Sequence, residues 1–325
     1  MTDYDYALEE CDVENKDSLR TFREKRAQWI EWFSGEDAHS VWNQMSFLFW
    51  DHALFCTVNE LRRLAAQSPT STVGFNSSVI RLFDKGFVTS QAVTIRRLIE
   101  KPKGGSRWAV MSLRRLLKDI QKNRGLITRE NYVSYDGLPY DPEAGLAEWT
   151  KNRIERGETA NFEWMESKGP SAWLTSKRAH ENFDRLSKVA PSDRKRTDQV
   201  LDVWFDRLAK KLEPCKAIKK YVDKFVAHAS DPATRKGLQT EELGITLEKL
   251  EQCLRAIYRV AAFLYGPLLW EGTYAPLPIP QFDVLKDIDK PWISAKDKAV
   301  AHKVWKEQVR KFNMLENEKL WPDQT

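Results

Sequence analysis

The sequence predicts an all-α protein, and two patterns carry that prediction. Apolar residues recur at steps of three and four through most of the chain, as at Trp42, Met45 and Phe49, which is the period of one helix face. No stretch carries a clear strand signal, either alternating apolar and polar residues or a β-branched run between turn residues. We therefore expect a bundle of several helices.

Four helices are expected in the first 124 residues. Ser34-Gly35-Glu36-Asp37 has the Ser-x-x-acid form of a capping box, which predicts the start of the second helix. The glycine- and proline-containing run 101–106 separates the third helix from the fourth, and Gly86 is a candidate break within the third. The apolar periods place these helices around 29–33, from 37 to beyond 61, at 77–100 and at 107–123.

The second half of the chain begins with a predicted loop at 125–141, which lacks a helical period. Asp141-Pro142 then supplies a cap and a first-turn proline for a new helix. A proline-rich segment at 271–291 is expected to lie over the surface. The expected helices are 142–156, 171–189, 193–212, 217–229, 246–269 and one capped from Ser294.

Composition is typical of a globular protein in the cytosol, with 42% apolar and 30% charged residues. The N-terminal residues resemble no secretory signal, and the longest apolar run, 257–270, is too short to span a bilayer. The four cysteines are isolated, as reduced thiols are. We expect a cytoplasmic protein without a membrane segment, divided into an acidic N-terminal arm (1–16), a helical domain (17–270) and a proline-rich segment with a C-terminal helix (271–325).

Charge is distributed unevenly along the chain. Residues 1–14 hold six acids and no base, whereas residues 101–124 hold eight bases and one acid. A basic face of this kind can contact phosphates, although a solvated helix face beside a frayed acidic tail has the same composition. The candidate nucleic-acid-binding residues are Arg107, Arg114, Arg115, Lys118, Lys122 and Arg124.

Several common catalytic and cofactor motifs are absent from the sequence. It contains no G-x-G-x-x-G, P-loop, G-x-S-x-G or H-E-x-x-H pattern. The histidines at 39, 52, 180 and 302 have no second histidine or cysteine at metal-ligand spacing. We expect no metal and no cofactor.

The stretch YVDKFVAHAS, residues 221–230, is the most informative one for function. On a helix, His228 falls at the edge of the buried face, one turn beyond Lys224. Nearby lysines disfavour the charged imidazolium, so the ring is expected to be neutral and able to accept a proton. The face predicted to be buried comprises Ile218, Tyr221, Val222, Phe225 and Ala229.

DKFVAHAS, followed by a linker and a long amphipathic helix, resembles the signature of HEPN domains, and most of all the abortive-infection AbiU-like branch. SQAVTIRRLIEK and VMSLRRLLKDI also resemble helices of that branch, so the similar segments span much of 80–265. The resemblance implies a helical bundle that forms a homodimer and cuts RNA without a metal. It also implies a bacterial phage-defence or toxin–antitoxin system, with an antitoxin or a defence protein as a further partner.

One residue of the family pattern is missing, because Val222 stands where the motif has arginine. Metal-free RNA cleavage needs a base, an acid and a cation for the phosphorane. His228 is the candidate base or acid, Asp223 matches the family's polar residue, and Lys224 or Lys220 is the candidate substitute cation. Three hypotheses stay open: an active ribonuclease, a catalytically degenerate module that binds nucleic acid or a partner, and a protein-interaction module.

Overall fold

Helices make up most of the described chain, which confirms the all-α prediction. Within the described residues the β-type pairing is limited to an isolated bridge between Thr128 and Gln199. The chain divides into two compact units, Met1–Leu277 and Pro278–Thr325. The computed structural model describes residues 4–67, 76–101, 110–157, 167–227, 244–272, 275–277, 279–290 and 297–314.

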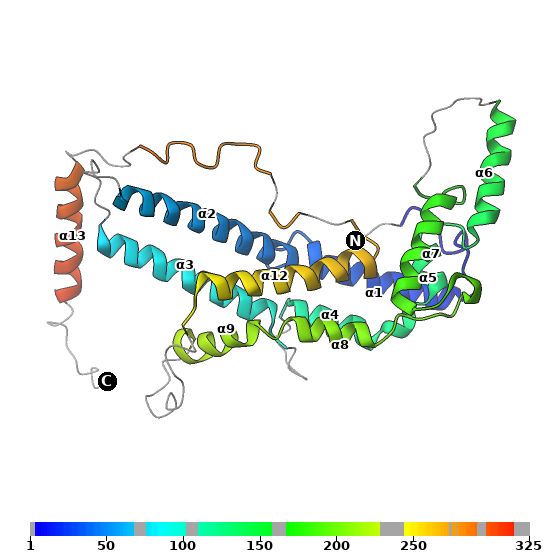
Figure 1. The fold of residues 1–325 in the computed structure, drawn as a ribbon, viewed down its shortest axis with the longest axis horizontal. Coiled ribbons are helices and arrows are strands. Elements are labelled where there is room, and N and C mark those ends of the chain that lie inside the picture. The colour runs from blue at the N-terminus through cyan, green and yellow to red at the C-terminus, as the bar shows by residue number, and fades with distance from the viewer. Residues whose placement is uncertain are drawn as a thin grey trace, which may run out of the picture. The chain divides into compact units, whose positions relative to one another are not determined.

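The first unit is a bundle whose long helices pack along one another (Figure 1). α12 contacts α2, α3 and α8, while α9 packs on α3, and α5, α6 and α7 gather at one end. Its helices are α1 (Lys16–Ser34), α2 (Val41–Gln67), α3 (Ser77–Leu98), α4 (Leu113–Lys122), α5 (Arg129–Ser134), α6 (Pro142–Arg156), α7 (Trp173–Ser187), α8 (Val203–Lys211), α9 (Cys215–Tyr221) and α12 (Leu247–Phe263). π-helical turns extend α9 over Val222–Val226 and α12 over Leu264–Leu268.

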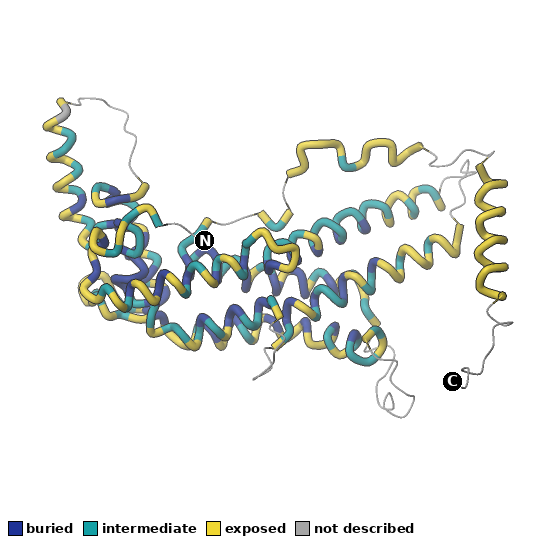
Figure 2. Tube along the Cα trace, turned by 180° about the vertical axis from the view of Figure 1, so that it is seen from behind, coloured by how far each residue is buried: buried dark blue, intermediate teal, exposed yellow. Residues whose placement is uncertain are grey.

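Apolar side chains from the long helices form one continuous core. Figure 2 shows that buried residues recur along these helices. Trp29 of α1, Ile95 of α3 and Ile257 of α12 are completely buried in it. Each of these helices turns an apolar face inward, and this burial supplies most of the stability of a helical bundle. α3 and α12 both pack into this core. The position of α3, and with it the surface between α3 and α9, is therefore fixed.

Residues 4–14, part of the predicted acidic arm, pack against the bundle. Cys11 and Val13 are buried, and the Tyr6 backbone N–H donates to Asp136 Oδ1 at 3.1 Å. The Tyr6 ring lies so close to Gly137 that a Cβ there would come within 2.4 Å of it. Gly137 has φ 79°, a backbone conformation that also favours glycine. The described part of this segment is therefore fixed in position on the bundle.

The loop predicted at 125–141 was wrong in part, because it contains α5 and a short 3₁₀ turn at Arg124–Leu126. Thr128 accepts the Asn131 backbone N–H and caps α5. Every residue of α5 is buried. A helix buried on all sides has no amphipathic period, which is the signal that a sequence pattern detects.

The helix predicted at 193–212 begins only at Val203. Before it, the backbone N–H groups of Arg129 and Glu130 donate to the carbonyls of Asp198 and Arg196, at 2.9 and 3.1 Å. Because the Arg196 and Asp198 carbonyls accept hydrogen bonds from α5, they are not available for the hydrogen bonds of a local helix. Tertiary pairing therefore replaces the local helix over this stretch.

Three other helix boundaries differ from the prediction. α2 begins at Val41 and not at the predicted capping box, because Ser34 is the last residue of α1. α3 runs without a break through Gly86, where a Cβ would meet nothing within 4 Å. α4 begins at Leu113, because the Ser112 side chain caps it by accepting the Arg115 backbone N–H. The described residues 110–112 are not helical, and the earlier part of the predicted 107–123 helix lies outside the described residues.

The second unit contains the predicted C-terminal helix, α13 (Asp297–Asn313), in which no residue is buried. The described residues between 275 and 290 form turns, in line with their proline-rich sequence. Among the helices that the structure describes, none has both the length and the hydropathy needed to span a membrane.

Candidate functional site

Asp223 lies between two cations where α9 packs against α3. The Arg96 Nε of α3 donates to Asp223 Oδ1 at 2.5 Å, and the Lys219 Nζ of α9 donates to Oδ2 at 2.6 Å. We call the group Arg96, Lys219, Lys220, Asp223 and Lys224 the α3–α9 seam. The packing of α3 on α9 thus joins residues that are 127 positions apart in the sequence.

The ionic partners decide what Asp223 can do chemically. Partial burial raises the pKa of Asp223, but the hydrogen bonds from Lys219 and Arg96 outweigh it and hold that pKa below its ordinary value. A carboxylate with a lowered pKa is a weak general base. Asp223 is therefore suited to orienting the Arg96 guanidinium, whose Nη1 also lies 3.4 Å from Glu100 Oε2.

Val222 is part of the core. It is 1% exposed and belongs to the continuous apolar cluster. The guanidinium near Asp223 comes instead from Arg96, whose side chain is 30% exposed. Arg96 lies in the segment SQAVTIRRLIEK, and the sequence assigns it no role because a partner from another helix leaves no local spacing signal.

The π-helical turn changes the face predicted for this helix. Phe225, predicted to be buried, is 38% exposed, whereas Ile218 and Val222 are buried as expected. A π turn adds a residue to the helical repeat and so rotates the side chains that follow. Lys220 is exposed, Lys224 is half-buried, and His228 lies outside the described residues.

Three of the five described residues of the predicted basic face have intramolecular partners. Arg114 lies 3.9 Å from Glu213, and Arg124 lies 3.5 Å from Asp202. The Arg115 guanidinium stacks 4.0 Å from the ring centroid of Trp32. Lys118 and Lys122 are exposed, and Arg107 lies outside the described residues. The predicted basic face therefore offers fewer free charges than its sequence suggests.

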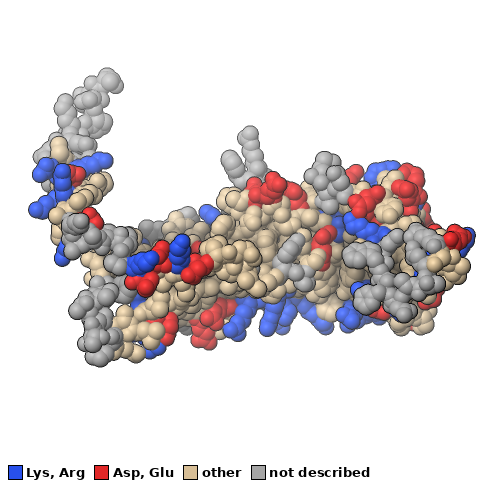
Figure 3. All heavy atoms as spheres, turned by 90° about the horizontal axis from the view of Figure 1, so that it is seen from above, with Lys and Arg blue, Asp and Glu red and all other residues tan. Residues whose placement is uncertain are grey.

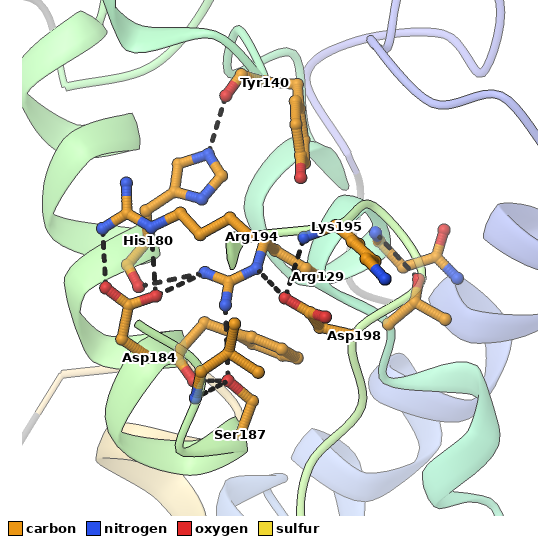
Figure 4. Close-up of polar contacts among 12 residues, drawn as sticks. Arg129, Tyr140, His180, Asp184, Ser187, Arg194, Lys195 and Asp198 are labelled. Atoms are coloured by element: carbon orange, nitrogen blue, oxygen red, sulfur yellow. Dashed lines mark hydrogen bonds and ion pairs between the residues drawn. The ribbon is translucent and has the colours of Figure 1, made fainter. Parts of the chain in front are cut away.

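A second polar cluster, which the sequence did not reveal, links α5 to α7 (Figure 4). Arg129 is 0% exposed and contacts Asp184 and Asp198 at 2.7 and 2.8 Å. Arg194 pairs with Asp184 at 2.6 Å, and His180 Nε2 contacts the Tyr140 carbonyl at 2.7 Å. The charged side chains of this cluster pair with one another, so we interpret the cluster as structural. We call this group of Arg129, Asp184, Arg194 and Asp198 the clasp.

Neither cluster has the composition of a metal site. Among the described residues, no group of three or more histidine, cysteine, aspartate or glutamate side chains is placed to hold a metal ion. The α3–α9 seam consists mainly of cations, which are suited to an anionic ligand.

No family model, curated protein or solved structure matches this chain. The HEPN resemblance therefore stays a hypothesis that rests on the motif residues and on the geometry around Asp223.

We expect acid to destabilise the protein through His180. Burial lowers the pKa of His180 from its ordinary 6.5 to about 4. The unfolded chain then binds more protons than the folded one between these values. The contribution of neutral His180 to the free energy of unfolding is therefore complete above pH 6.5 and is lost as the pH falls toward 4. The loss between pH 7.5 and 5 is about 2 kcal/mol.

Urea unfolding at the two pH values measures this loss. His180→Gln should reduce the difference between them, and His39→Gln, at an exposed histidine, should leave it unchanged. Equal pH dependence in all three proteins would assign the acid effect to other groups.

Proposed function

We propose that this protein is a HEPN-like, RNA-directed protein of a bacterial phage-defence or toxin–antitoxin system, and that the α3–α9 seam contacts an RNA phosphate. The observation that carries the proposal is the position of Arg96, held 2.5 Å from Asp223. Arginine offers a planar fork that matches phosphate oxygens, which lysine cannot do. Arg96 thus supplies, from another helix, the cation that Val222 does not.

We assign the three roles of metal-independent RNA cleavage to Arg96 and Asp223 in the seam and to His228, which lies outside the described residues. His228 exchanges the proton of the 2′-hydroxyl or of the leaving oxygen. Arg96 stabilises the charge of the phosphorane, and Asp223 orients Arg96. Since His228 is the one candidate proton-transfer residue of the motif, we propose a homodimer in which the two 215–230 segments face each other and each supplies one proton-transfer group.

A second candidate function is an RNA-binding module without catalysis. Two observations favour it: Val222 fills the motif position with a core residue, and Arg96 is already shared between Asp223 and Glu100. A guanidinium engaged by two carboxylates has less charge to offer a transition state.

Cleavage of a labelled RNA in the presence of a chelator tests the proposal. We expect Arg96→Ala and His228→Ala each to lower the cleavage rate at least 100-fold, a loss typical of removing one stabilising donor or one acid–base group. Arg97→Ala is the matched control, because Arg97 is the next residue of α3 and is exposed. Light scattering on the same sample should give twice the chain mass of 37.9 kDa.

The other outcomes are equally clear. RNA binding without cleavage would select the degenerate module. Absence of RNA binding would contradict the proposal, and cleavage that is insensitive to both variants would place the active site elsewhere.

A further inference from the structure

α8 and α12 meet at a pair of aromatic rings. The ring centroids of Trp204 on α8 and Phe263 on α12 are 5.7 Å apart, inclined by 36°. The indole N–H of Trp204 donates to the Leu186 carbonyl at 2.8 Å, which fixes the orientation of the ring. Both side chains are partly exposed, so the pair is accessible from solvent.

Basic side chains surround this aromatic pair. The Lys188 ammonium and the Arg207 guanidinium each lie 5.2 Å from the Trp204 ring centroid. Arg259 lies one helical turn before Phe263. The exposed bases of this region are Lys188, Arg207, Lys210, Lys211, Arg255 and Arg259, which we call the α8–α12 strip.

The strip has little compensating negative charge. Arg255 lies 3.4 Å from Glu251, and for the other five bases the structure gives no ion pair with any described residue. This differs from the predicted basic face at 107–124, where Arg114 and Arg124 face carboxylates. Figure 3 shows lysine and arginine side chains gathered in a row along one edge of the molecule.

We propose that the α8–α12 strip binds the sugar–phosphate backbone of a single-stranded RNA, an inference that rests on the proposed function for the identity of the nucleic acid. The exposed bases are spread over two helices and do not enclose a pocket for a small anion. Such a spread of charge suits a linear polyanion. The partly exposed ring of Trp204, beside Phe263, offers an aromatic surface on which an unpaired base can stack. The strip thus supplies binding energy away from the α3–α9 seam.

Salt-dependent binding tests this proposal. Fluorescence anisotropy of a labelled 20-nucleotide oligo(U) is measured between 50 and 200 mM NaCl for the wild type and for Lys210→Gln/Lys211→Gln. Each lost phosphate contact reduces the slope of log affinity against log salt by about 0.7, so the double variant should be shallower by about 1.4. Its affinity at 100 mM NaCl should fall roughly tenfold.

A matched control distinguishes the strip from general charge. Lys303→Gln/Lys306→Gln removes two exposed lysines from α13, and it should change neither slope nor affinity. Equal effects of the two double variants, or an unchanged slope in the strip variant, would overturn the proposal.

Two further outcomes separate this inference from the proposed function. If the wild type binds RNA, Arg96→Ala lowers cleavage and the strip variant binds normally, the strip proposal fails while the proposed function stands. If the strip variant instead loses binding to phosphatidylglycerol vesicles and keeps its RNA slope, the strip belongs to a lipid surface and the RNA proposal is overturned.

Discussion

Replacing Arg129 by methionine is expected to lower the free energy of unfolding by about 3–5 kcal/mol, the range found when one partner of a buried ion pair is removed. Arg129 is 0% exposed and is the common partner of Asp184 and Asp198. Methionine fills much of the same volume but leaves Asp198 without its guanidinium. Asp184 keeps Arg194 as a partner, so the cost falls mainly on Asp198.

Urea unfolding at pH 7 measures this effect, and Arg124→Met is the matched control. Arg124 also pairs with an aspartate, Asp202 at 3.5 Å, but its side chain is 39% exposed. Exposed pairs contribute about 0–1 kcal/mol, so this variant should unfold almost as the wild type does. A loss below about 1 kcal/mol for both variants would show that the clasp does not stabilise the fold.

Introducing the arginine of the HEPN motif with Val222→Arg is expected to destabilise the protein by more than about 3 kcal/mol, because it forces a charge into an apolar environment. Val222 is 1% exposed among core residues, and the nearby carboxylate of Asp223 already binds Arg96 and Lys219. The new guanidinium therefore has no free partner among these groups. Thermal unfolding followed by circular dichroism measures the loss.

Phe225→Arg provides the comparison for that variant. Phe225 lies in the same π-helical turn but is 38% exposed, so arginine there can reach solvent. We expect a much smaller shift in melting temperature. If Val222→Arg folds normally and gains RNA cleavage, position 222 belongs to the active site and the role that we give to Arg96 is wrong.

Predictions from the sequence were most accurate where the signal is local. Asp141 caps α6 by accepting the Glu143 backbone N–H, as the Asp-Pro pattern predicted. They were wrong where neighbours replaced the local signal. Fully buried α5 has no polar face, and the carbonyls of residues 196 and 198 bond to α5 instead of forming a helix.

The sequence by itself determined the all-α class, the presence of most helices and the stretch that contains Asp223, because periodicity and caps involve residues within a few positions of each other. Only the tertiary structure decided that Arg96 is the cation beside Asp223, that Phe225 is exposed, and that Arg129 holds two carboxylates. Arg96 and Asp223 are 127 positions apart, and Arg129 is 55 and 69 positions from its two carboxylate partners. The exposure of Phe225 depends on the π turn after α9. No local pattern encodes them, since they arise from how the helices pack.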